Sequence, residues 1–181
     1  QTNKKLFLLG SGSDNTTIYS GGKTVSLSHD TKDFTIKGFR IESTGDAALD
    51  IVDNQNTKVI ECVIKNSVTG LARENMSAVV VYGADSKDAV EFYNCVFIES
   101  VNGIYASGSG PLNIINSIFY KTTGTGIYLY QNCNAIVQNS IFLDNGSTVY
   151  ISSNSIMTLA YNLFHINDND SHDGSALGTI A

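Results

Sequence analysis

The sequence predicts an all-β fold, a right-handed parallel β-helix (solenoid) of about seven coils whose strands form three parallel sheets. Short strands with alternating apolar residues end at corners rich in asparagine, as in the stretch 126–142, GIYLYQNCNAIVQNSIF. Similar stretches recur along the chain, and each is too short to bury its own apolar face unless it stacks on another copy. The recurrence also keeps a nearly constant period, which a repeat fold requires.

The apolar residue that closes each repeat defines this period. Successive closing residues lie 22 or 23 residues apart, except for one interval of 33. The closing residues are Ile18, Ile41, Ile64, Phe97, Phe119, Phe142 and Phe164. A second series, in the first strand of each coil, is Val25, Leu49, Val79, Ile104, Ile127 and Val149. We expect each series to form one interior column.

Comparison of the two series locates the extra residues of the long interval. They fall in two insertions, at 71–77 and at 83–89. Insertions in repeat proteins bulge from corners and often line a functional face.

Each strand within a repeat is short. In the stretch 126–142 we expect strands at 126–130 and 135–138, a polar turn at 131–134, and a third strand that starts at 140.

The three cysteines are expected to be free thiols. Cys62 and Cys95 occupy the same repeat position, so they should be stacked neighbours inside the coil. Side chains stacked in register hold their Cβ atoms farther apart than a disulfide prefers. Cys133 lies in a turn without a matching partner.

Composition limits the classes of function. A length of 181 residues suits one β-helix domain, 1–181, and the net charge of −6 argues against a nucleic-acid partner. No apolar run reaches the length of a membrane span. Neither end carries an element that caps a solenoid, and an uncapped solenoid exposes core and strand edges. We therefore expect this domain to have been cut from a longer, multi-domain polypeptide.

Two repeats carry a resemblance to a known group of proteins. The units NSIF at Asn116–Phe119 and Asn139–Phe142, each preceded by GIY, resemble repeats of the pectate-lyase-like β-helix superfamily. The resemblance covers nearly the whole chain and implies the fold. It implies no single activity, because that superfamily includes polysaccharide lyases, glycoside hydrolases, esterases and non-catalytic modules. Some members resemble a carbohydrate-binding module appended to xylanases.

Alternation in the first strand of each coil predicts two outward columns of side chains. One column is Ser26, Asp50, Val80, Tyr105, Tyr128 and Tyr150. The other is Ser28, Val52, Tyr82, Ser107, Tyr130 and Ser152.

Five tyrosines therefore share one face, and we interpret them as an exposed platform for a glycan. Sugar rings stack on aromatic side chains, and tyrosine hydroxyls reach sugar hydroxyls. The predicted carbohydrate-binding residues are Tyr82, Tyr105, Tyr128, Tyr130, Tyr150 and Asp50. The alternative is that the tyrosines only stabilise the sheet by stacking on one another.

A weaker candidate surface is an apolar column on another sheet, Ile98, Tyr120 and Leu143. Which residue of those strands points inward stays open, because the neighbours Val96, Ile118 and Ile141 are apolar too.

The platform lacks the groups that catalysis on polysaccharides needs. Neither column contains Lys, Arg or His, and their single carboxylate is Asp50, whereas hydrolysis uses two carboxylates. The sequence therefore predicts no catalytic residue. An enzymatic alternative uses Asp50, Asp53 and Arg73. Further candidates for it are Asp46, Glu74, Asp85 and Lys121.

No cofactor is expected, although calcium stays open. The loop 167–174 is rich in oxygen ligands but misses the EF-hand pattern. His165 and His172 have no zinc spacing, so no metal-binding residues are predicted.

These observations lead to one functional hypothesis and two alternatives. The hypothesis is a non-catalytic carbohydrate-binding module that recognises a plant cell-wall polysaccharide, and a face without cations suits a neutral polymer better than a polyuronate. Xylan is favoured because of the resemblance to the module appended to xylanases. We expect it to be secreted or at the cell surface and covalently linked to a catalytic domain. The alternatives are a polysaccharide lyase or glycoside hydrolase, and a structural segment of a surface protein.

Overall fold

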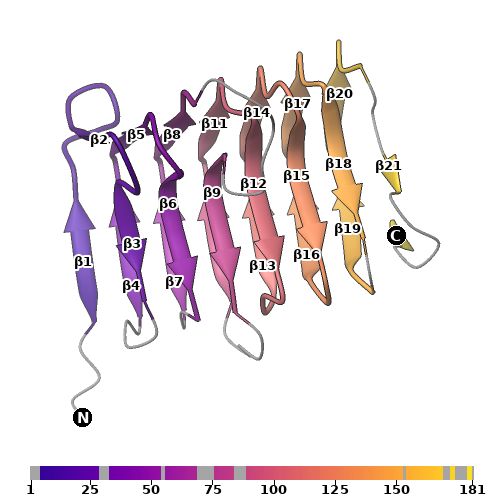
Figure 1. Ribbon diagram of the computed structural model, residues 1–181, viewed down its shortest axis with the longest axis horizontal. Helices are drawn as coiled ribbons and strands as arrows, with labels where there is room; N and C mark the ends of the chain where they lie inside the picture. Colours follow the sequence, from indigo (N-terminus) through magenta and orange to yellow (C-terminus); the bar gives the residue numbers. More distant parts are fainter. Residues whose placement is uncertain are drawn as a thin grey trace.

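The computed structural model describes residues 5–28, 33–53, 56–68, 76–83, 89–152 and 154–168, and the backbone alone at 172–173 and 179–180. Every regular element within these ranges is a short β-strand. The described part of the chain contains no helix long and apolar enough to cross a membrane. Figure 1 shows the coils side by side along the long axis, from the indigo N-terminal coil to the yellow C-terminal one.

The strands form three sheets of eight, seven and seven strands. Sheet A contains β1 (Leu6–Leu9), β4 (Phe34–Lys37), β7 (Thr57–Ile60), β10 (Val90–Tyr93), β13 (Leu112–Ile115), β16 (Asn134–Gln138), β19 (Ile156–Ala160) and β22 (Thr179–Ile180). Sheet B contains β2 (Thr17–Ser20), β5 (Arg40–Ser43), β8 (Val63–Asn66), β11 (Val96–Ile98), β14 (Ile118–Tyr120), β17 (Ile141–Leu143) and β20 (Leu163–His165). Sheet C contains β3 (Val25–Leu27), β6 (Ala47–Val52), β9 (Ser77–Tyr82), β12 (Asn102–Ser107), β15 (Thr125–Tyr130), β18 (Ser147–Ile151) and β21 (His172–Asp173).

The chain visits sheets A, B and C in turn and then returns to sheet A one coil further on. Each strand consequently pairs with the strand three places later in the sequence, and every pair is parallel. This arrangement confirms the predicted parallel β-helix with three sheets. It buries the apolar face of each repeat against the repeats on either side, which no single repeat could do for itself.

The closing residues form one interior column on sheet B, as predicted. The observed register joins them in the expected order along the whole sheet. The rings of Phe97, Phe119, Phe142 and Phe164 stack with centroids 4.6, 4.7 and 5.1 Å apart. The second series is also in register, on sheet C. The sequence therefore predicted the interior correctly.

Asparagine occupies three of the corners between sheets A and B, at a position where the backbone is left-handed. Asn94, Asn116 and Asn139 have φ values of 54°, 52° and 51°. Asparagine tolerates this conformation better than most residues, since its short polar side chain bonds locally. Two-residue corners of this kind keep the strands of sheets A and B in phase from coil to coil.

The corner between sheets B and C contains a buried ladder of amide hydrogen bonds. The Oδ1 of Asn145 accepts from the backbone N–H of Thr122 at 3.0 Å and from its hydroxyl at 2.8 Å. The Nδ2 of Asn145 donates to the carbonyl of Phe119, and its backbone N–H donates to Asn167 Oδ1, each at 3.0 Å. The ladder satisfies backbone groups that the turn leaves without strand partners.

All three cysteines are free and buried. Cys62 and Cys95 lie at equivalent corner positions of neighbouring coils, because the Val96 N–H donates to the Cys62 carbonyl and the Ile118 N–H to the Cys95 carbonyl. This confirms the predicted placement. Burial raises the pKa of both thiols, and that of Cys95 reaches about 12.

We expect none of the three thiols to react with a thiol-specific disulfide reagent at neutral pH while the protein is folded. The reactive species is the thiolate, which burial disfavours. Rapid labelling of the native protein would contradict the observed burial, and guanidinium-unfolded protein provides the positive control.

The raised pKa of Cys95 also affects the stability of the fold. Burial raises this pKa from the ordinary value of 9.0 to about 12, so the folded protein holds the proton more tightly than the unfolded chain does. The contribution of this thiol to stability is therefore complete below pH 9 and is lost as pH rises toward 12.

Candidate functional site

The two predicted outward columns lie on sheet C in the expected register. Backbone pairing joins Asp50 to Val80, Val80 to Tyr105, Tyr105 to Tyr128 and Tyr128 to Tyr150. The second column pairs Val52 with Tyr82, Tyr82 with Ser107 and Ser107 with Tyr130. Five tyrosines therefore do share one face, at the spacing of neighbouring coils.

The tyrosine rings pack on one another along the helix axis. The ring centroids of Tyr128 and Tyr150 lie 4.4 Å apart with planes inclined by 21°, and those of Tyr105 and Tyr128 lie 5.3 Å apart at 33°. Tyr82 meets Tyr105 edge to face, with centroids 5.8 Å apart. The faces of Tyr128 are consequently directed at its two neighbours. A ligand outside the column meets ring edges and hydroxyls.

Tyr105 departs from the predicted exposed strip. Only 2% of it is exposed, and it forms a small hydrophobic cluster with Ala47 and Val80 on the outer side of sheet C. Tyr82, Tyr128 and Tyr130 pack against this cluster and stay partly buried. The expectation that Tyr105 belongs to an exposed strip is therefore corrected. Its ring anchors the tyrosines around it.

Asp50 is also buried, which corrects the expectation that it is exposed on this face. Its side chain is 3% exposed, and its Oδ2 accepts hydrogen bonds from Lys23 Nζ at 2.7 Å and from the Ser26 hydroxyl at 3.3 Å. A carboxylate out of water needs such partners, because desolvation of an unpaired charge is costly. The hydrogen bond to Asp50 raises the pKa of Lys23.

Lys23 is the residue that sequence reasoning missed at this face. It lies just before β3, outside the two columns, so alternation within strands could not reveal it. Its spacing was the available signal. Lys23 precedes Asp50 by 27 residues, slightly more than one coil, which places it on the neighbouring coil. The face therefore does hold a cation, and that cation forms a salt bridge with Asp50.

The residues named for an enzymatic alternative lie only partly within the described part of the chain. Asp46 is exposed and Asp53 is partly buried in a left-handed corner with φ of 47°. Lys121 follows a strand of sheet B, and its Nζ lies 5.0 Å from the ring centroid of Tyr120. Arg73, Glu74 and Asp85 lie outside the described residues.

Metal ligands are likewise not gathered among the described residues, where no three His, Cys, Asp or Glu side chains could hold one ion. In the loop 167–174, Asn167 accepts hydrogen bonds from the backbone N–H and the Nδ2 of Asn145, at 3.0 Å each. This residue therefore serves the corner ladder. Side chains 169–174, on which the calcium question depends, lie outside the described residues.

The weaker candidate surface on sheet B is in register as well. Ile98, Tyr120 and Leu143 pair in order and are partly buried. The open question of which residue points inward is answered by Phe97, Phe119 and Phe142, each 0% exposed. Both flanking columns on sheet B therefore face outward.

Comparisons with known proteins agree with this architecture. The family model described as "Right handed beta helix region" matches residues 73–177. Among solved structures, pectin methylesterase from carrot aligns with a TM-score of 0.51 at 13% identity, covering 97% of this chain and 72% of that one. At this identity the likeness shows the fold alone. No curated protein matches the sequence. Because the family model spans more than half of a chain that coils through three parallel sheets, the protein belongs to the right-handed beta helix family.

Proposed function

We propose that this domain binds a neutral plant cell-wall polysaccharide of the xylan type, without cleaving it, on the tyrosine face of sheet C. The observation that carries the proposal is a set of four partly exposed tyrosines on the same face as the buried ring of Tyr105, namely Tyr82, Tyr128, Tyr130 and Tyr150. We further propose that the domain is secreted or displayed at the cell surface, and that it is covalently linked to a catalytic domain.

The stacked geometry favours recognition through hydroxyls. Each tyrosine hydroxyl both donates and accepts hydrogen bonds, as sugar hydroxyls do. The ring centroids of Tyr128 and Tyr150 lie 4.4 Å apart, close to the strand spacing of about 4.8 Å, so the tyrosine rings repeat along the helix axis. A glycan that runs along the axis meets a rigid row of such groups. Rigid aromatic side chains lose little conformational entropy on binding.

The electrostatics of the face favour binding over cleavage. Hydrolysis needs two carboxylates on either side of the scissile bond, whereas the single carboxylate of the two columns, Asp50, is buried against Lys23. The two columns contain no cation, and Lys23 beside them is paired with Asp50, which suits a neutral polymer better than a polyuronate.

We expect Tyr128→Phe to weaken binding to xylohexaose several-fold, because it removes one hydroxyl and keeps the stacked ring. A hydrogen bond of this kind contributes about 0.5–1.5 kcal/mol. Tyr128→Ala should weaken binding further, since it also removes the ring between Tyr105 and Tyr150. Isothermal titration calorimetry measures both effects, and wild-type affinity should be on the order of micromolar to millimolar.

The matched control is Tyr161→Phe, because Tyr161 is 89% exposed and lies away from sheet C. This variant should bind as the wild type does. Melting temperatures separate lost binding from lost structure. If both Tyr128 variants fold and bind normally, the tyrosine face is not the site. If the wild type binds no polysaccharide, the structural alternative is favoured.

The enzymatic alternative is tested on the same protein. Release of reducing ends or unsaturated products from xylan, pectate and alginate is measured with and without calcium, and no turnover is expected. Turnover that Asp50→Asn abolishes would overturn the binding proposal and would assign Asp50 a catalytic role.

A further inference from the structure

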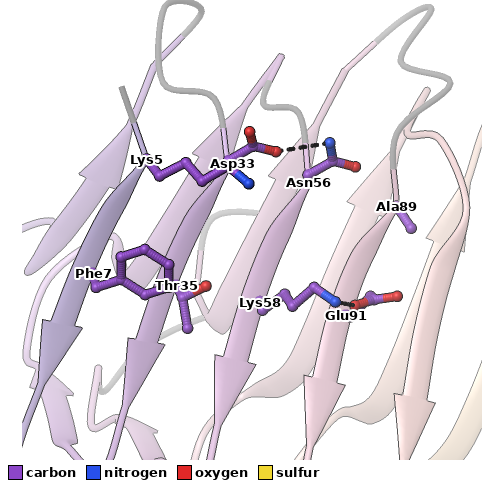
Figure 2. Close-up of a pocket in the computed structure, with 8 residues that line it drawn as sticks. All are labelled: Lys5, Phe7, Asp33, Thr35, Asn56, Lys58, Ala89 and Glu91. Carbon is purple, nitrogen blue, oxygen red and sulfur yellow. Dashed lines mark hydrogen bonds and ion pairs between the residues drawn. The ribbon is translucent and has the colours of Figure 1, made fainter. Parts of the chain in front are cut away.

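A groove of about 420 Å³ lies on the outer face of sheet A, away from the tyrosine face. It crosses β1, β4, β7 and β10, and Figure 2 shows the side chains that line it. Its floor is one outward column in register, in which Phe7 pairs with Thr35, Thr35 with Lys58 and Lys58 with Glu91. The groove therefore runs along the helix axis over four neighbouring coils, a length of about 14 Å at the strand spacing.

Two polar pairs, each joining neighbouring coils, fix the chemistry of the groove. Lys58 Nζ lies 2.8 Å from a Glu91 carboxylate oxygen, and Asn56 Nδ2 donates to Asp33 Oδ1 at 2.9 Å. The side chain of Glu91 is 18% exposed and that of Lys58 is 49% exposed. The bond to Glu91 raises the pKa of Lys58, so this side chain stays charged over the physiological range.

These pairs keep hydrogen-bonding capacity for a ligand. An ammonium group has three donors, a carboxylate has about four acceptor sites, and an amide both donates and accepts. One bond within each pair uses part of that capacity and holds the groups in place. Donors and acceptors held next to each other match the neighbouring hydroxyls of a sugar ring, each of which both donates and accepts.

An exposed aromatic ring lies at one end of the groove. Phe7 is 58% exposed, whereas Tyr105 in the tyrosine stack is 2% exposed. Figure 2 shows its ring beside Thr35, at the end of the groove opposite Glu91. Aromatic surface of this kind accepts the apolar C–H face of a sugar ring.

We propose that this groove is a second glycan-binding site, which takes a short segment of a neutral polysaccharide along the helix axis. One sugar stacks on Phe7, and the hydroxyls of the sugars that follow bond to the Asp33–Asn56 and Lys58–Glu91 pairs. The charges of the lining favour a neutral chain, because the ammonium groups of Lys5 and Lys58 are balanced by the carboxylates of Asp33 and Glu91. The site stands independently of the tyrosine proposal, since none of its residues lies on sheet C.

The test is Phe7→Ala, with Leu9→Ala as the matched control. Leu9 lies on the same strand and is 71% exposed, but it does not line the groove. The probes are xylohexaose and a hexamer of galacturonic acid, measured by calorimetry and by chemical-shift perturbation. Phe7→Ala should weaken xylohexaose binding several-fold, and Leu9→Ala should leave it unchanged. Asn56→Gly, a second exposed variant, removes the amide at a left-handed position with φ of 53° that glycine accepts, and should weaken binding in the same way.

The two proposed sites fail in distinguishable ways. Loss of binding in Phe7→Ala and Asn56→Gly supports the groove, when the ligand still perturbs the chemical shifts of sheet A in Tyr128→Phe. Normal binding in both groove variants, while Tyr128→Phe is impaired, overturns the groove and leaves the tyrosine site standing. Preference for the galacturonic acid hexamer over xylohexaose overturns the neutral-ligand assignment. A wild-type protein that binds neither probe overturns both sites.

Discussion

Phe119→Ala should destabilise the domain by about 3–5 kcal/mol, the range for truncation of a fully buried phenylalanine. Phe119 is 0% exposed, and its ring lies between those of Phe97 and Phe142 with centroids 4.6 and 4.7 Å away. Truncation removes both stacked contacts and leaves a cavity between coils that are held in register by the sheets. Chemical denaturation followed by circular dichroism measures the loss.

The control for this variant is Tyr120→Ala on the same strand. Tyr120 points outward and is partly buried, so its removal opens no cavity in the interior. The loss in the free energy of unfolding should be clearly smaller for Tyr120→Ala than for Phe119→Ala. Equal denaturation midpoints for the two variants would show that the phenylalanine column does not carry the stability of these coils. Since a solenoid is stabilised by contacts between neighbouring repeats, the loss should also reduce the cooperativity of unfolding.

Gly103→Ala should cost about 1–3 kcal/mol or more, because an extra methyl group has no space there. A Cβ at this position would lie 2.5 Å from the carbonyl oxygen of Gly126 and 2.7 Å from Cδ1 of Phe119. The first contact is with backbone in the neighbouring coil, which cannot move aside without disturbing the pairing of β12 and β15. Thermal unfolding gives the size of the effect.

Gly22→Ala makes the same chemical change at a site where a Cβ meets nothing within 4 Å. It should be neutral or stabilise the fold by up to about 1 kcal/mol, because alanine restricts the unfolded chain more than glycine does. A loss at Gly22 as large as that at Gly103 would mean that the cost reflects glycine propensity and not the close approach of two coils.

The sequence by itself determined the fold and the directions of most strand side chains. Alternation within a strand fixes which residues share a face, and a period of 22 or 23 residues fixes which residues stack. The period therefore places Phe97, Phe119 and Phe142 in one column, and Tyr128 in a column with Tyr150, as the backbone pairing confirms. Burial then shows that the three phenylalanines point inward. The corners were also visible in the sequence as stretches rich in asparagine, one of the few residues that accept a left-handed backbone.

Only the tertiary structure decided how deep the outward residues lie. Alternation along a strand predicts whether a side chain points inward or outward, but not how much of it the neighbouring side chains cover. It therefore could not distinguish Tyr105, which is buried, from Tyr128, which is partly exposed. The pairing of Lys23 with Asp50 was hidden for a related reason. Lys23 lies outside the strands, and the reach of a long side chain from a corner is not constrained by the repeat.

The groove on sheet A was also beyond sequence reasoning, because its spacing is irregular. Phe7, Thr35, Lys58 and Glu91 are separated by 28, 23 and 33 residues, so no fixed period links them. Backbone pairing nevertheless places them in one column, since corners of different length can join strands that remain in register. In a solenoid the hydrogen-bonded sheets, and not the lengths of the turns, decide which side chains become neighbours.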